Sequence, residues 1–260
     1  MSEKFADLTV HAPWFSNHPA LTNLVEEFLG ILMVRSYFSN AAGKKNPFAS
    51  VIEQAEMRVR LDGLEKQIPK DGPCVIAANH SHGGPDAIAL SAKCLELRPD
   101  ALVLANAELM KLPGVDKLFL PVSILQEESA AAANSKSLRT MLKHVRGGGC
   151  VVVFPAGRVA FWQDGEIQDP LWNDHIVTLI QRMNATVVPV WFFGGTPPWM
   201  QICSKLSAFV RTALIPRSLR EMKGKEIVGR VGEAFPSEQM KGHEKDWLRK
   251  HLESLREIGN

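Results

Sequence analysis

Two histidines and an aspartate share one short loop, and these residue types can perform acid–base chemistry. The loop covers residues 79–86 and reads Asn-His-Ser-His-Gly-Gly-Pro-Asp. A neutral imidazole, of His80 or of His82, can accept a proton near pH 7. A carboxylate on the other ring nitrogen would orient the ring and stabilise the imidazolium. Gly83 and the glycine after it allow a tight path that returns Asp86 to a histidine. The loop therefore predicts a general base, with either histidine as the candidate.

A second loop with chemical potential, residues 154–158, reads Phe-Pro-Ala-Gly-Arg and also follows an apolar segment. A glycine beside an arginine at a strand end suits contact with a phosphate or a carboxylate, as Gly157 and Arg158 would provide. A simple turn with a surface arginine explains this loop equally well when it is taken alone.

Short apolar segments that alternate with helical ones predict where the two loops lie. The strand candidates are residues 57–64, 74–79, 101–106, 119–124, 150–155, 185–195 and, as an edge strand, 225–235. Amphipathic helices are predicted between them, for example over 128–146 and 173–183. This alternation predicts an α/β fold with a mostly parallel sheet flanked by helices. Ligands of such sheets bind beyond the carboxyl ends of the strands, where both loops fall.

An amphipathic segment precedes this pattern, at residues 20–38. Leu21, Leu24 and Phe28 share one helical face, and Glu26 and Glu27 lie opposite. Such a helix either packs on the core, the commoner outcome, or lies in a membrane interface. We expect residues 1–56 to form an N-terminal helical segment able to dock on a membrane, and residues 57–260 to form the α/β domain.

Composition excludes several classes of protein. The 260 residues are 45% hydrophobic and 22% charged, which is unlike a disordered chain. The net charge of +2 is unlike a dedicated nucleic-acid binder, so no nucleic-acid partner is expected. Four cysteines at positions 74, 94, 150 and 203 form no CxxC motif or Cys/His cluster, so neither a metal site nor a disulfide framework is predicted.

The location of the protein is also constrained by the sequence. No secretory signal and no apolar run of about 20 residues is present, which predicts a cytoplasmic protein without a membrane span. Residues 211–230 carry six basic and two acidic side chains. This run could face anionic lipid head groups, the phosphates of coenzyme A or an acidic carrier protein. It could equally be a solvated surface.

Taken together, four ordered blocks between residues 57 and 200 resemble the lysophospholipid acyltransferase superfamily, the PlsC-like glycerolipid acyltransferases. The blocks are Asn79-His80 with Asp86, residues 108–113 followed by 119–122, residues 154–157, and Val187-Val188-Pro189-Val190. They are similar, in that order, to the catalytic NH…D motif, the acceptor-site block, the FPEG motif and an apolar V-P-V block. Each block alone is weak, but the four in order are specific.

The resemblance implies transfer of a fatty acyl group from acyl-CoA or acyl carrier protein to a hydroxyl of a lysolipid-like acceptor. It implies no metal, no cofactor and no acyl-enzyme. The helix of residues 20–38 and the basic run of residues 211–230 together predict peripheral attachment to the inner face of the cell membrane. By analogy with the family, His80 is the base, Asp86 orients it, and amides near Gly157 could hold the oxyanion. The implied substrate-binding residues are Asn79, Ser81, His82, Gly83, Phe154, Pro155, Ala156, Gly157 and Arg158.

Departures from the family pattern point to an unusual acceptor. Five residues instead of four separate His80 from Asp86; Asn79 directly precedes His80, as in the family, and this selects His80 over His82. Ala156 replaces the glutamate of FPEG, and Arg158 follows the glycine by one place instead of two. The second block also lacks its phosphate-binding arginine. Because specificity depends on such polar pairs, we expect an acceptor other than lysophosphatidic acid, such as a lyso-aminolipid or another hydroxylated amphiphile.

Two alternatives remain open at this level. The altered FPEG block would suit a non-catalytic protein that binds acyl lipids or acyl carriers on the same scaffold. A thioesterase in which His80 activates water would need no acceptor pocket at all.

Overall fold

One mixed β-sheet forms the centre of the computed structural model, which describes residues 5–8, 13–123, 128–163, 165–204 and 208–257. In spatial order its strands are β1 (Arg58–Asp62), β9 (Glu226–Val231), β8 (Thr186–Phe192), β2 (Cys74–Ala78), β5 (Cys150–Val153), β3 (Leu102–Asn106) and β4 (Phe119–Val122), with β10 (Phe235–Pro236) also paired to β8. The pairings of β8 with β9 and β10 are antiparallel, and the other pairings of this sheet are parallel. The predicted mostly parallel α/β sheet is confirmed.

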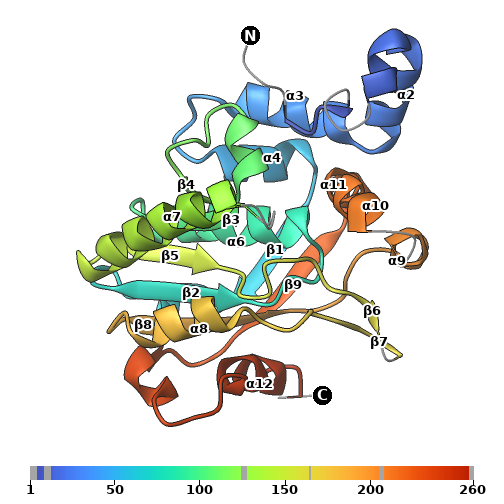
Figure 1. The fold of residues 1–260 in the computed structure, drawn as a ribbon. Helices are drawn as coiled ribbons and strands as arrows, with labels where there is room; N and C mark the ends of the chain where they lie inside the picture. Colours follow the sequence, from blue (N-terminus) through green and yellow to red (C-terminus); the bar gives the residue numbers. More distant parts are fainter. Residues whose placement is uncertain (1–4, 9–12, 124–127, 164, 205–207, 258–260) are drawn as a thin grey trace.

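Helices cover both faces of the sheet (Figure 1). The helices are η1 (Pro13–Asn17), α2 (Pro19–Phe28), α3 (Ile31–Ala41), α4 (Pro47–Gln54), α5 (Leu64–Gln67), α6 (Gly84–Leu97), η2 (Ala107–Lys111), α7 (Glu128–Arg146), α8 (Asp174–Gln181), α9 (Pro198–Ser204), α10 (Ala208–Ala213), α11 (Ile215–Glu221), η3 (Ser237–Met240) and α12 (Trp247–Ser254). A short hairpin, β6 (Phe161–Gln163) and β7 (Glu166–Gln168), forms a separate two-stranded sheet.

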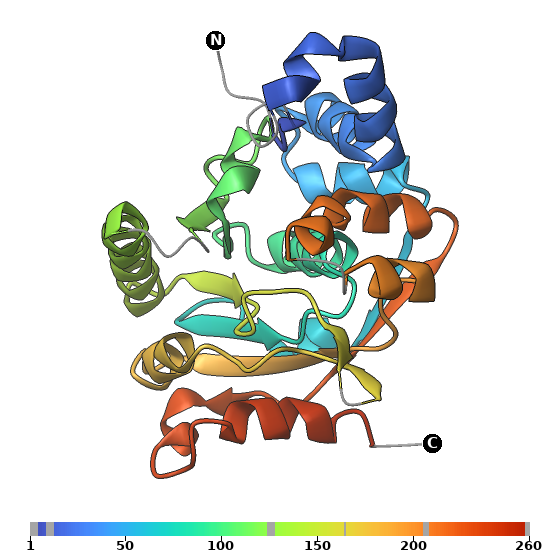
Figure 2. The ribbon, with the colours of Figure 1, turned by 45° about the vertical axis from the view of Figure 1, so that its right-hand side comes forward.

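The sheet separates two hydrophobic cores, and strand β2 contributes to both. Alternate side chains of a strand point to opposite faces; thus Ile76 packs with α3, α4, α6 and α11, whereas Val75 packs with α7, α8 and α12. Figure 2 shows the two helical layers on either side of the sheet. All five residues of β2 are buried, because a strand covered on both faces must be apolar throughout.

Strand β9 differs from the expectation. It was expected at an edge, but it lies between β1 and β8, and β1 forms the edge. Gly229 explains the close fit, because a Cβ atom there would press into the side chains of Leu61 and Phe192 on either side. The prediction that β9 lies at an edge was therefore wrong. Gly229 weakens the sequence pattern of a buried strand, but its lack of a side chain lets β9 pack closely between β1 and β8.

The predicted helix over residues 20–38 is two helices, broken at Gly30. Gly30 adopts φ 76°, and a Cβ there would lie 3.0 Å from the carbonyl oxygen of Pro216. After the break, α3 buries Val34 and Phe38 in the core. Core packing thus holds for α3, and the single continuous helix was wrong.

Helix α2 is oriented with its polar side toward the protein. Glu26 is only 5% exposed and pairs with Arg35 of α3, with the Oε2 and Nη1 atoms 2.6 Å apart. In contrast, Leu24 is 62% exposed and Phe28 is 54% exposed. With Leu21 they form an outward-facing stripe, which we name the α2 apolar face (Leu21, Leu24 and Phe28).

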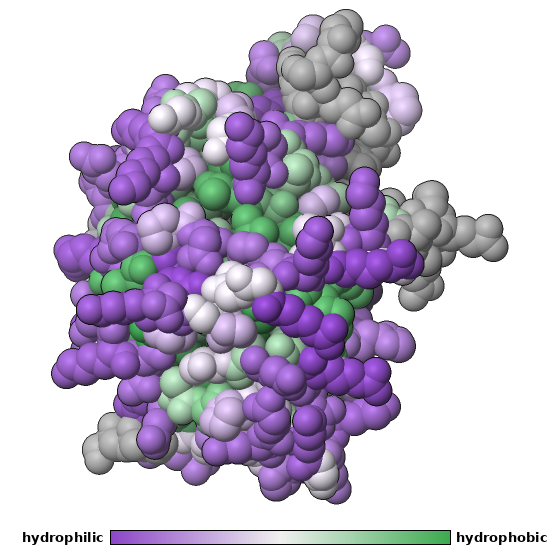
Figure 3. All heavy atoms as spheres, turned by 90° about the vertical axis from the view of Figure 1, so that its left-hand side faces the viewer, coloured by the Kyte–Doolittle hydropathy of each residue, from purple (hydrophilic) through white to green (hydrophobic). Residues whose placement is uncertain are grey.

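The surface at the amino ends of β2 and β5 is polar, unlike the α2 apolar face. Viewed from the left-hand side of Figure 1, it consists mainly of hydrophilic residues (Figure 3). Within the described residues, no helix combines the length and apolarity needed to cross a bilayer.

Candidate active site

The two loops singled out in the sequence meet at the carboxyl ends of neighbouring strands. β2 leads into residues 79–83 and β5 leads into residues 154–158, and β2 and β5 pair side by side. The rings of His80 and Phe154 pack with their centroids 4.5 Å apart. Gly83, with φ 77°, leads into α6, and a Cβ there would lie 3.0 Å from a methyl group of Val159. The predicted convergence of the loops is therefore present.

The ring of His80 lies against the carboxylate of Asp86. Nδ1 of His80 is 2.9 Å from Oδ1 of Asp86, which is fully buried in the first turn of α6. The N–H direction at Nδ1 is not aligned with this oxygen, as is common before a substrate is bound. Asp86 is held by two main-chain donors, the amides of His82 at 2.8 Å and of Ala87 at 2.7 Å. The carboxylate is thus fixed, and the ring of His80 can turn onto it.

Opposing effects set the pKa of His80. Burial alone would lower it, but the negative charges of Asp86 and, more weakly, Asp169 outweigh burial, so the pKa of His80 lies above its ordinary value of 6.5. A histidine with a raised pKa is a stronger base, and it is neutral at pH values above that pKa. The arrangement can therefore abstract a proton through the remaining ring nitrogen, Nε2.

The second histidine of the loop has a different environment. Nε2 of His82 lies 2.8 Å from the carbonyl oxygen of Phe193 and, as the donor, carries the proton there. The same loop residue contacts Asp86 through its main-chain amide and not through its ring. Asp86 therefore partners the ring of His80, which fits the choice of register made from Asn79.

Several residues expected to touch substrate are occupied within the protein. The side-chain amide of Asn79 donates to the main-chain carbonyl of Phe192 at 3.0 Å and accepts from the main-chain N–H of Phe192 at 2.6 Å. These two bonds link the end of β2 to β8. The amide of Gly157 donates to the carbonyl of Phe154 at 2.9 Å, closing a turn. The side chain of Asn79 and the amide of Gly157 thus bond within the protein in this structure, and the expected substrate contact of Asn79 and the expected oxyanion contact of amides near Gly157 stay predictions.

The other predicted residues of the second loop divide into buried and exposed. Ala156 and Pro155 are buried, and Ala156 packs in the core shared with α7 and α8. Arg158 is exposed. On the first loop, the hydroxyl of Ser81 is buried and has no hydrogen-bond partner among the described residues.

Asp169 was not predicted from the sequence, yet its carboxylate contacts the main chain of His80. The main-chain amide of His80 donates to both carboxylate oxygens of Asp169, at 3.1 and 3.2 Å. Asp169 follows the β6–β7 hairpin, which the sequence analysis also missed. The dipeptide Asp164-Gly165 between Phe161–Gln163 and Glu166–Gln168 is a common two-residue hairpin signal and could have revealed it.

Metal ligands were not expected. Within the described ranges, no group of three His, Cys, Asp or Glu side chains is placed to hold a metal ion.

A helix-flanked sheet with a His–Asp pair at the carboxyl end of its central strand defines the class of the protein as PlsC-like in fold. The chain superposes on the crystal structure of the 1-acyl-sn-glycerophosphate acyltransferase PlsC from Thermotoga maritima with a TM-score of 0.52 and 17% identity, covering 87% of this chain and 95% of that one. At this identity the likeness concerns the fold alone. The sequence matches the family model described as Acyltransferase over residues 1–242. The chain therefore belongs to this acyltransferase family, within the lysophospholipid acyltransferase superfamily.

Two curated relatives are similar in sequence. Both are lyso-glycine lipid O-acyltransferases. The one from Phocaeicola vulgatus is 30% identical over 173 residues, covering 63% of this chain and 58% of the relative. The one from Bacteroides thetaiotaomicron is 30% identical over 149 residues, covering 55% of this chain and 51% of the relative. The chain thus matches little more than half the length of these relatives.

Proposed function

We propose that the protein is an O-acyltransferase that moves a fatty acyl group from an acyl thioester to the hydroxyl of a lysolipid. The observation that carries the proposal is the pairing of the His80 ring with Asp86, 2.9 Å apart, at the carboxyl end of β2. Membership of the acyltransferase family and the names of the two relatives support the same activity.

The reaction follows from these groups. Nε2 of His80 takes the proton of the acceptor hydroxyl while its oxygen attacks the carbonyl carbon of the thioester. The carbon–oxygen bond forms and the carbon–sulfur bond breaks. The imidazolium of His80 holds the proton until the leaving thiolate takes it. Asp86 orients the ring and stabilises its positive charge, and this general-base catalysis accounts for about 10²- to 10⁴-fold in rate.

For the acceptor we propose a lysolipid with a carboxylate head group, of the lyso-glycine lipid type. Ala156 and Arg158 depart from the family's phosphoglycerol pattern. A pocket beside the catalytic loop is lined by His82, Gln201 and Arg211, among others. Burial and the nearby positive charge of Arg158 lower the pKa of Arg211. The guanidinium group of Arg211, which lines this pocket, suits a planar anion such as a carboxylate.

We further propose that the protein reaches its substrates at a membrane surface, docked through the α2 apolar face. The stripe of Leu21, Leu24 and Phe28 faces outward, while the polar Glu26 is buried. Arg217 and Arg220 donate to the last carbonyls of α2, at Phe28 and Glu27; Arg217 also pairs with Glu221, so Arg220 is the cation that brings positive charge beside the stripe. An apolar helix face flanked by positive charge is suited to the interface of an anionic bilayer.

The test is a transfer assay with the purified protein. An acyl-CoA or an acyl carrier protein is offered as donor, and a lyso-glycine lipid or lysophosphatidic acid as acceptor. We expect the O-acylated glycine lipid as product with at least one donor, and at least tenfold less product from lysophosphatidic acid. His80→Ala should reduce the rate by about 10²-fold or more.

Two results would contradict the proposal. Hydrolysis of the thioester at the same rate without an acceptor would indicate a thioesterase. Tight binding of acyl chains with no turnover on any acceptor would indicate a binding protein. A preference for lysophosphatidic acid would contradict only the proposed acceptor.

A further inference from the structure

Both main-chain groups of His80 are held by one segment, the stretch that contains the β6–β7 hairpin. The amide of Ala160, just before β6, donates to the carbonyl of His80 at 2.8 Å. The amide of His80 donates to the carboxylate of Asp169, just after β7, at 3.1 and 3.2 Å. The hairpin therefore clamps the backbone of His80 from both sides, and any shift of Asp169 moves the imidazole.

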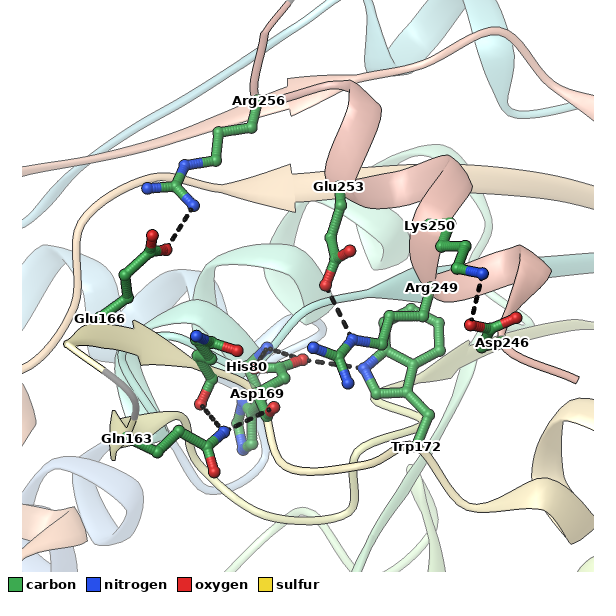
Figure 4. A network of polar contacts seen from close by, with 11 residues as sticks. His80, Gln163, Glu166, Asp169, Trp172, Asp246, Arg249, Lys250, Glu253 and Arg256 are labelled. Carbon is green, nitrogen blue, oxygen red and sulfur yellow. Dashed lines mark hydrogen bonds and ion pairs between the residues drawn. The ribbon is translucent and has the colours of Figure 1, made fainter.

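Asp169 is itself held firmly. The indole Nε1 of Trp172 donates to Oδ2 of Asp169 at 3.1 Å, and Trp172 is buried in the core on the α7–α8 side. The side-chain amide of Gln163 donates from Nε2 to the main-chain carbonyl of Asp169 at 3.2 Å. Figure 4 shows the carboxylate between His80 and the indole. Asp169 is 7% exposed, so its charge acts on His80 with little screening by water.

The negative charge of Asp169 shifts the pKa of His80 upward, which makes His80 a stronger base. The charged groups that act on His80 are Asp86 from α6 and Asp169 after β7; both negative charges raise the pKa of His80 against its burial. Phe154, which packs on the ring, carries no charge, and the ring of His82 faces Phe193. Burial raises the pKa of Asp169 to about 6, against the hydrogen bonds from His80 and Trp172. At neutral pH the carboxyl group is therefore ionised.

We propose that Asp169 is a positioning residue for the reaction: it fixes the main chain of His80 and, as a buried carboxylate, stabilises the imidazolium that forms on this ring. The proposal rests on the proposed role of His80 as the base. Asp169 exchanges no proton during transfer; the acceptor's proton passes to Nε2 of His80 and then to the leaving thiolate. Asp86 orients the ring, and Asp169 orients the backbone that carries the ring.

The variant Asp169→Asn tests the proposal, because it is nearly isosteric and removes the charge. We expect kcat to fall about 10- to 100-fold with little change in KM, since a displaced base costs turnover. We also expect the acid limb of the kcat/KM profile to move to lower pH, because loss of a negative charge lowers the pKa of His80. Asp169→Ser, also uncharged and smaller, provides a second variant, with thermal unfolding as the check of folding.

One intermediate variant and one matched control complete the set. Trp172→Phe removes the indole donor, which lowers the pKa of Asp169, but keeps the carboxylate; less of Asp169 is then ionised near neutral pH, so the acid limb should move to lower pH by less than in Asp169→Asn. Asp174→Asn removes a carboxylate five residues further on that is exposed and paired with Lys245; kcat and the limb should stay unchanged. An acid limb that stays in place in both Asp169 variants, with kcat within twofold, would overturn the proposal.

A readout without turnover separates this inference from the proposed function. The pKa of His80 is measured by NMR titration of its ring protons, assigned with His80→Ala. It should fall in Asp169→Asn and Asp169→Ser even if no acceptor is found. An unchanged pKa would refute the charge effect, whereas a lowered pKa without any acyl transfer would refute only the proposed function.

Discussion

The imidazole of His80 has one nitrogen committed to Asp86, and this limits which atom can take a proton. Nδ1 faces the carboxylate at 2.9 Å, so in the proposed reaction Nε2 is the nitrogen left for the acceptor hydroxyl. The second imidazole of the loop, His82, donates to the carbonyl of Phe193. At the residue scale the two histidines thus have different environments: the ring of His80 lies against Asp86, and the ring of His82 holds the loop against the end of β8.

This separation predicts unequal effects of two alanine substitutions. His80→Ala should reduce kcat by about 10²-fold or more, because the base is lost. His82→Ala should keep the pH profile and cost stability, on the order of 1 kcal/mol for one hydrogen bond. Rates and urea unfolding of both variants check this. Full activity in His80→Ala with loss in His82→Ala would reassign the base.

The raised pKa of His80 predicts the acid side of the pH profile. The base must be neutral, so kcat/KM should fall as pH drops through a pKa that lies above the ordinary value of 6.5. Asp86→Asn removes the stronger of the two charges that raise this pKa. Its acid limb should move to lower pH while kcat drops. The profiles of kcat and kcat/KM from pH 5 to 9 measure the fall in kcat and the shift of the acid limb. A limb that moves to higher pH in Asp86→Asn would contradict the assignment of this limb to His80.

At the scale of elements, the sequence predicts the chain segments better than their surroundings. The apolar runs Cys74–Ala78 and Cys150–Val153 and the long periodic segment of α7 were correctly predicted, because burial on both faces or on one stripe leaves a clear pattern. The hairpin of β6 and β7 was missed, because three-residue strands carry almost no periodicity. Asp169 was missed with it: its partner, the main chain of His80, is 89 residues away and has no sequence signal.

Gly30 shows why one predicted helix became two. Amphipathic spacing continues across it, but φ 76° is a conformation that other residues adopt at a cost of about 1–2 kcal/mol. Gly30→Ala should therefore lower the free energy of unfolding by about that amount, plus the cost of its contact with Pro216. Gly43→Ala is the control, since Gly43 has φ 79° and open space around it. If urea unfolding gives the same loss of unfolding free energy for Gly30→Ala and Gly43→Ala, the contact with Pro216 adds no cost.

The α2 apolar face leads to a prediction about lipid surfaces. Leu24→Ser and Phe28→Ser should each weaken binding to anionic phosphatidylglycerol vesicles, measured by sedimentation, about tenfold or more, because burying such a side chain contributes on the order of 1.5–3 kcal/mol. Leu97→Ser, at the end of α6 and also partly exposed, is the matched control and should bind as the wild type does. If the Leu24 and Phe28 variants bind vesicles normally but change the oligomeric state, the face is a contact between copies.

For the whole molecule, the sheet carries the site between two separate cores. Trp172 joins the core of α7, α8 and α12 to Asp169, so packing on that side supports the backbone of His80. Leu252 of α12 is fully buried in the same core. Leu252→Ala should lower the free energy of unfolding by about 2–5 kcal/mol, through lost burial and a cavity. Urea unfolding checks this, and a loss below 1 kcal/mol would mean that α12 is dispensable to the core.

The pairing of β1 with β9 also has a consequence for synthesis on the ribosome. Arg58–Asp62 pairs with residues that start at Glu226, and ribosomes add about 5–20 residues per second. The first strand of the chain, β1, therefore emerges on the order of ten seconds before β9, with which it pairs, and a free strand edge can pair with other chains. β1 alternates Arg58, Arg60 and Asp62 with its apolar residues. Because charged side chains on a strand disfavour pairing with other strands, we expect these residues to limit association of β1 with copies of itself during synthesis.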